Sequence, residues 1–104
     1  MNWNQHKDDL AAGKTVEFRP KGNSMSPKIE SGQLVTVEPV EDYNEIEKDD
    51  IVFCRVKGNF YVHLVTAKQK KMGGIRFQIG NNKGRTNGWI FEDKVFGKVT
   101  KVTD

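Results

Sequence analysis

The chain has 104 residues, of which 36% are apolar and 30% are charged, and its formal net charge is +3. This length is enough for one domain with a modest core and excludes a multidomain protein. No run approaches the roughly 18 apolar residues that a membrane helix needs, and the N-terminus lacks the apolar stretch of a signal peptide. We therefore expect a cytoplasmic protein with no membrane partner.

The segment before residue 14 is predicted to be helical. A short helix can form over residues 4–12, because Asn2 or Asn4 can serve as its N-cap and Gly13 is placed to end it. We expect this helical segment, residues 1–13, to belong to a single domain whose remaining residues, 14–104, form a β domain.

From residue 15 onward, the sequence has the pattern of an antiparallel β fold. Short segments rich in β-branched and aromatic residues are separated by Gly, Pro and Asn at intervals of about ten residues. Lys57-Gly58-Asn59 is typical of a tight turn that joins two paired strands. Residues 41–50 are predicted to be a solvated acidic loop. The predicted strands are Thr15–Arg19, Leu34–Pro39, Asp50–Lys57, Asn59–Lys68, Gly74–Gly80, Trp89–Phe91 and Lys94–Val102.

Cysteine and histidine are too few for metal or disulfide chemistry. Cys54 is the only cysteine, and there are two histidines, so neither an intramolecular disulfide nor a metal cluster is expected. Cys54 alternates with Val52 and Val56, which favours a buried strand residue over a reactive thiol. We expect no metal and no cofactor.

The segment from Pro20 to Ile29 carries the clearest chemical signal. Gly22 before Ser24, and Pro27 after it, indicate a bent backbone that presents the serine hydroxyl beside amide N–H groups. A nucleophilic serine needs such a turn, because the oxyanion that develops must find its donors already in place. A serine in a Gly- and Pro-rich turn is, however, more often only a turn residue.

Motifs along the chain add to this signal through their order. Together they resemble the motifs of the superfamily that joins signal peptidases with LexA-like self-cleaving repressors, over roughly residues 13–102. The most specific element is Ser-Met-x-Pro with a downstream Gly-x-x-Val. The motifs are GNSMSP (22–27), GQLVTV (32–37), KDDIVF (48–53), YVHLV (61–65), IGNN (79–82) and VFGKV (95–99).

The resemblance implies a compact fold of the LexA C-terminal type and the chemistry of a serine peptidase. Carried over by position, Ser24 is the nucleophile and His63 is the base, in place of the lysine used by bacterial signal peptidases and LexA-like proteins. A neutral imidazole, with an ordinary pKa of about 6.5, can accept a hydroxyl proton at neutral pH. Activity should then decline as the pH falls through roughly 6 to 7. The amides of Asn23 and Ser24 are the expected oxyanion donors.

The chain departs from the pattern of these relatives at the third catalytic position. Relatives with a histidine base carry an aspartate that orients the imidazole, whereas residues 80–87 read GNNKGRTN, without a carboxylate. Asn81 is the expected supporting residue: it can hold a histidine tautomer but cannot stabilise the imidazolium by charge. The alternative function is therefore a catalytically inactive β domain used for dimerisation or assembly.

The resemblance also implies partners. A polypeptide, or the chain itself, would be the substrate, and a homodimer is expected. We expect neither a membrane anchor nor a helix-turn-helix before residue 13. Ala12-Gly13 resembles the Ala-Gly bond that LexA-like proteins cut in themselves, but only eleven positions separate Gly13 from Ser24.

Charge supports a third alternative, a weak nucleic-acid-binding module. Residues 1–52 contain six Lys/Arg and eleven Asp/Glu, whereas residues 53–104 contain eleven and three. Two halves that fold against each other with complementary charge explain this asymmetry more simply than a nucleic-acid surface. The residues that would form such a surface are Lys68, Lys70, Lys71, Arg76, Lys83 and Arg85, with Phe77 and Trp89 for stacking.

Overall fold

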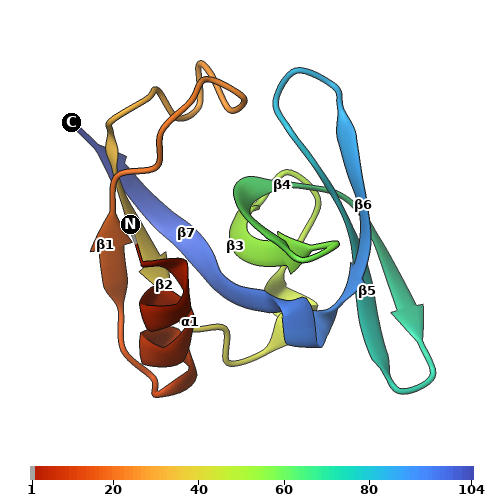
Figure 1. Cartoon of the computed structure of the whole chain (residues 1–104). Helices are drawn as coiled ribbons and strands as arrows, with labels where there is room; N and C mark the ends of the chain where they lie inside the picture. Colours follow the sequence, from red (N-terminus) through yellow and green to blue (C-terminus); the bar gives the residue numbers. More distant parts are fainter. Residues whose placement is uncertain (1) are drawn as a thin grey trace.

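A computed structural model describes residues 2–104 and shows a mostly β domain built on one seven-stranded antiparallel sheet (Figure 1). The strand order is β1-β2-β7-β3-β4-β5-β6. From residue 2 onward, no helix is long and apolar enough to cross a membrane. In chain order the elements are α1 (Trp3–Ala11), β1 (Val16–Phe18), β2 (Leu34–Glu38), η1 (Tyr43–Glu45), β3 (Ile51–Val56), β4 (Asn59–Lys71), β5 (Gly74–Gly80), β6 (Thr86–Phe91), η2 (Glu92–Lys94) and β7 (Val95–Thr103).

The predicted fold class is confirmed. One short N-terminal helix and seven strands are present, and each strand begins and ends within three residues of its predicted bounds. β3 and β4 form the expected hairpin, in which Val56 pairs with Asn59. Lys57 and Gly58 in its turn have φ values of 51° and 83°, as a tight hairpin turn requires.

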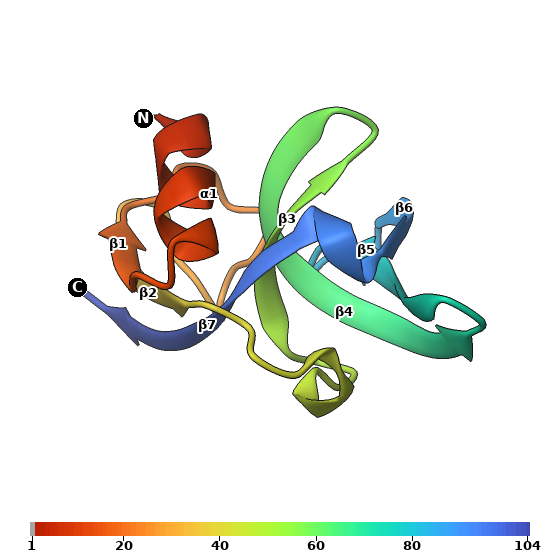
Figure 2. The same cartoon turned by 90° about the horizontal axis from the view of Figure 1, so that it is seen from below.

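The helix α1 packs on the β1 side of the sheet (Figure 2). Asn2 is its N-cap, and its side-chain oxygen accepts a hydrogen bond of 3.0 Å from the first turn. Leu10 is buried, and the Trp3 ring meets Phe18 edge-on with 5.5 Å between ring centroids. The chain leaves the helix through Gly13, whose φ of +85° favours glycine.

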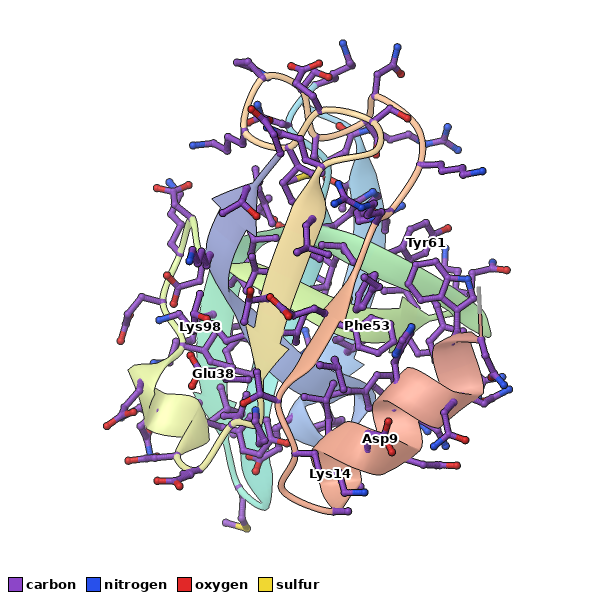
Figure 3. The ribbon with its side chains drawn as sticks, turned by 90° about the vertical axis from the view of Figure 1, so that its left-hand side faces the viewer. Asp9, Lys14, Glu38, Phe53, Tyr61 and Lys98 are labelled. Atoms are coloured by element: carbon purple, nitrogen blue, oxygen red, sulfur yellow. The ribbon has the colours of Figure 1, made fainter. Side chains whose placement is uncertain are left out.

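Two hydrophobic clusters share the central strand β3. Because strand side chains alternate between faces, Phe53 belongs to the cluster beneath α1, whereas Val52, Cys54 and Val56 belong to the other. Figure 3 shows Phe53 in the interior, behind β1 and β2. Cys54 is a buried residue of β3, as predicted, and burial raises the pKa of its thiol to about 12.

The acidic segment 41–50 is more than a solvated loop. It contains η1, and Ile46 beside it is 1% exposed in the second cluster. The Tyr43 hydroxyl donates a hydrogen bond of 3.0 Å to the carbonyl of Val95 on β7. The prediction weighed only the carboxylates of this segment and missed the two side chains that close the core.

Candidate active site

Ser24 lies in the loop between β1 and β2, and this loop is closed at its base. The amide of Gly32 donates to the carbonyl of Pro20 at 3.1 Å, and the amide of Gly22 donates to Ser31 Oγ at 3.1 Å. These bonds return the chain to β2 and hold both ends of the turn, so the position of Ser24 is fixed by the backbone around it.

The underside of the same turn is anchored in the core. Met25 and Ile29 are each 4% exposed and belong to the cluster beneath α1. Met25 follows the serine directly, so its burial leaves Ser24 at the surface of the core, where it is half-buried. The Ser-Met pair of the sequence motif therefore has a structural meaning, since the buried methionine anchors the turn that carries Ser24.

Asn82, in the connection between β5 and β6, binds the turn from the other side. Its amide donates to the carbonyl of Ser24 at 3.0 Å, and its side-chain nitrogen donates to the carbonyl of Ser26 at 2.9 Å. Asn82 thus ties the serine turn to the β5–β6 hairpin. The role of Asn82 was not predicted, because the sequence marks this residue only by an amide side chain within the IGNN motif.

The predicted nucleophile and base meet in the structure. Ser24 Oγ and His63 Nε2 are 3.1 Å apart, although 39 positions separate the residues in sequence. His63 lies on β4 and is 7% exposed. Tyr61, two positions earlier, stacks on the imidazole with 4.7 Å between ring centroids. This burial lowers the pKa of His63 below its ordinary 6.5, against a smaller, raising effect of the hydrogen bond with Asn87.

Asn87 sets the tautomer of His63. Its Oδ1 lies 2.7 Å from His63 Nδ1. An amide oxygen can only accept, so Nδ1 carries the proton and donates it to Asn87. Nε2 then carries no proton, and its lone pair faces the Ser24 hydroxyl. This is the arrangement that a general base requires.

A bulge in β6 puts Asn87 in this position. Ile79 pairs with Gly88 and Gly80 pairs with Thr86, so Asn87 between them has no partner in the ladder. A bulge bends its strand and re-aims the extra residue, and here it turns the amide toward the imidazole.

The expectation for Asn81 is therefore corrected. Its Oδ1 accepts from the amides of Lys83 and Arg85, both at 2.9 Å, so it shapes the β5–β6 turn. The amide that holds the histidine comes from Asn87, six positions further on. The prediction chose Asn81 by its position in the IGNN motif, whereas the bulge in β6 brings Asn87 to the imidazole.

The expected oxyanion donors lie at the start of the turn. The carbonyl of Asn23 accepts from the amide of Ser26 at 3.2 Å. In the part of the chain from residue 2 on, the amides of Asn23 and Ser24 donate to no other protein group. Both N–H groups therefore remain available as hydrogen-bond donors at the start of the turn.

Ser24, His63 and Asn87 line one cleft of about 410 Å³. Its walls come from α1, the serine turn, β4, and the β5–β6 turn together with the start of β6. The apolar side chains of this wall are Trp3, Met25, Ile29, Phe60 and Val62.

Several residues named for the third alternative make contacts within the protein itself. Phe77 is fully buried and cannot stack on a base. The guanidinium of Arg76 already covers the Trp89 ring, at 4.7 Å from its centroid. Lys68 donates to Glu47 at 3.1 Å and to the carbonyl of Asn44 at 2.7 Å, and it does not line the cleft.

The Ala12-Gly13 bond lies away from the serine turn. Figure 3 shows the C-terminal end of α1, marked by Asp9 and Lys14, at the opposite end of the molecule from the loop before β2. Gly13 lines a different surface depression from the one that contains Ser24. In this structure Ser24 cannot reach that bond within the same chain.

The chain belongs to the Peptidase S24-like family, whose model matches residues 3–99. This match confirms the resemblance to the LexA-like and signal peptidase-like superfamily that the motifs indicated. A search of curated proteins finds no match.

Replacing Asn82 with alanine is expected to slow acylation of Ser24 about tenfold, because the serine turn loses its side-chain tie to the hairpin and the hydroxyl becomes less well oriented. The rate of labelling by a fluorophosphonate probe measures this. The matched control is Lys83→Ala in the same turn, which removes an exposed side chain that does not line the cleft. Equal rates for Asn82→Ala and the wild type would contradict the role of the tie.

Proposed function

We propose that this protein is a serine peptidase in which Ser24 attacks a peptide carbonyl and His63 accepts the serine proton. The observation that carries the proposal is the 3.1 Å contact between Ser24 Oγ and His63 Nε2, with His63 held in the acceptor tautomer by Asn87. Membership of a peptidase family supports it. The proposed substrate is a polypeptide segment.

In the proposed reaction, Ser24 Oγ forms an ester with the acyl part of the substrate while its proton moves to His63 Nε2. The amides of Asn23 and Ser24 would stabilise the carbonyl oxygen as it becomes negative. The imidazolium then gives the proton to the leaving amine, and the peptide C–N bond breaks. A water molecule hydrolyses the ester by the same steps, with His63 again as the base, and Ser24 is restored.

A specific observation favours a second candidate, the inactive assembly domain. Asn87 orients the imidazole, but it carries no charge to stabilise the imidazolium that forms during the reaction. A dyad supported by an amide is expected to be slower than one supported by a carboxylate. The two candidates therefore differ in one measurable property, the reactivity of Ser24.

Labelling by a fluorophosphonate probe tests the proposal. The wild type should acquire one adduct, which mass spectrometry assigns to Ser24, and Ser24→Ala should acquire none. Ser26→Ala is the matched control, since Ser26 lies in the same turn but its hydroxyl donates a hydrogen bond to Glu30 Oε2 at 3.1 Å. Ser26→Ala should be labelled. If the wild type acquires no adduct, or if Ser24→Ala is labelled to the same extent as the wild type, the result would favour the assembly domain.

A further inference from the structure

The charged side chains that line the cleft around Ser24 are positive. Lys21 and Arg85 line it, whereas none of the aspartates and glutamates in residues 2–104 does. The chain as a whole has 14 acidic residues, so the positive lining does not result from a shortage of carboxylates in the sequence. The nearest carboxylate in the same loop, Glu30, does not line the cleft, and it accepts a hydrogen bond from Ser26.

The two cations come from different loops, and both loops are fixed. Lys21 lies between Pro20 and Gly22, whose backbone groups close the base of the serine loop. The amide of Arg85 donates a hydrogen bond to Asn81 Oδ1, and the carbonyl of Arg85 accepts one from the amide of Asn81, both at 2.9 Å. Both charges are therefore carried on backbone whose position is set before any ligand arrives, which limits the entropy lost on binding.

Both cations also lack an internal partner. Lys21 and Arg85 are exposed, and within residues 2–104 neither forms an ion pair with a carboxylate. Lys68, by contrast, is paired with Glu47, and Lys98 is paired with Asp50 at 3.3 Å. The charge of the cleft is thus available to a ligand.

We propose that the cleft selects polypeptide segments in which an apolar residue is accompanied by a nearby Asp or Glu. The apolar side chain would lie against the wall formed by Trp3, Phe60 and Val62, and the carboxylate would be bound between Lys21 and Arg85. This substrate class rests on the proposed peptidase function. The observation that carries it is the combination of an apolar wall with two unpaired cations on fixed loops.

Peptide binding to the Ser24→Ala protein tests the substrate class without relying on catalysis. The probes are decapeptide libraries with Leu fixed at the fifth position and either Glu or Gln placed at each other position in turn. Isothermal titration at low salt gives the affinity of each library. At one or two positions beside Leu, the Glu library should bind about three- to tenfold more tightly than its Gln counterpart, and salt should reduce this preference.

Charge-reversal variants show which residues cause the preference for Glu over Gln. In Lys21→Glu/Arg85→Glu the preference should disappear or reverse, and the single changes Lys21→Gln and Arg85→Gln should each reduce it. The matched control is Lys70→Glu/Lys71→Glu, which makes the same change of charge on exposed residues at the end of β4, outside the cleft. There the preference should persist. Circular dichroism confirms that each variant is folded.

Equal affinities for Glu and Gln libraries, or a preference that survives Lys21→Glu/Arg85→Glu, would overturn this inference. So would displacement of the bound peptide by a single-stranded DNA oligonucleotide that binds more tightly, since the cations would then serve phosphates. A preference for Glu together with a wild type that no fluorophosphonate labels would support the acidic ligand class and contradict only the peptidase function.

Discussion

Replacing His63 with alanine is expected to slow the acylation of Ser24 by about a thousandfold or more at pH 7, because within residues 2–104 the side-chain group in hydrogen-bond contact with the Ser24 hydroxyl is His63 Nε2. Lys68→Ala is the matched control, and it should be labelled at nearly the wild-type rate. Lys68 is the nearest lysine that follows on β4, but its ammonium group is held by Glu47 and Asn44. The reverse result would show that a lysine is the base.

The pH dependence of acylation tests the same assignment. A base that is protonated loses activity, so the rate should fall as the pH falls through the pKa of His63. Burial lowers that pKa, so the midpoint should lie below the 6.5 that is ordinary for an unperturbed imidazole. A midpoint clearly above 7, or a rate that is unchanged at every pH below the ordinary pKa, would contradict a histidine base.

Replacing Asn87 with aspartate is expected to accelerate acylation about ten- to a hundredfold above the midpoint of the acid limb. The new carboxylate would stand 2.7 Å from His63 Nδ1 and would stabilise the imidazolium by charge. For the same reason it would raise the pKa of His63, so the acid limb should move to a higher pH. Rate and midpoint, measured together over a pH series, distinguish this effect from a change in protein stability.

Two further variants serve as controls for Asn87→Asp. Asn87→Leu keeps the size of the side chain but removes the acceptor, so it should slow acylation and leave the buried Nδ1–H without a partner, at a cost of about 1–3 kcal/mol in stability. Asn81→Asp places a carboxylate in the β5–β6 turn but not on the imidazole, so the shift of the acid limb should be much smaller. A larger shift for Asn81→Asp than for Asn87→Asp would contradict the structural assignment.

The strands and the helix could be predicted because their signals are local. Alternation of apolar residues marks β3, the Lys57-Gly58 turn marks its hairpin with β4, and Asn2 and Gly13 mark the ends of α1. Ser24 and His63 could be predicted as a pair only from the order of the motifs. Nothing in the local sequence of β4 shows that His63 faces a loop 39 positions earlier.

The roles of Asn82 and Asn87 could not be predicted, because both depend on register. A bulge changes which residues face the site, and the residues 80–87 contain no pattern that places the bulge at Asn87 and not elsewhere.

The bulge at Asn87 also changes the exposed edge of the sheet. β6 lies at the end of the sheet and pairs only with β5, so its outer side carries the unpaired N–H and C=O groups of an edge strand. A regular edge of this kind invites a strand of another molecule to add to the sheet. The extra residue interrupts the even spacing of those groups, so one irregularity both directs an amide at His63 and makes the exposed edge a poor template for another chain.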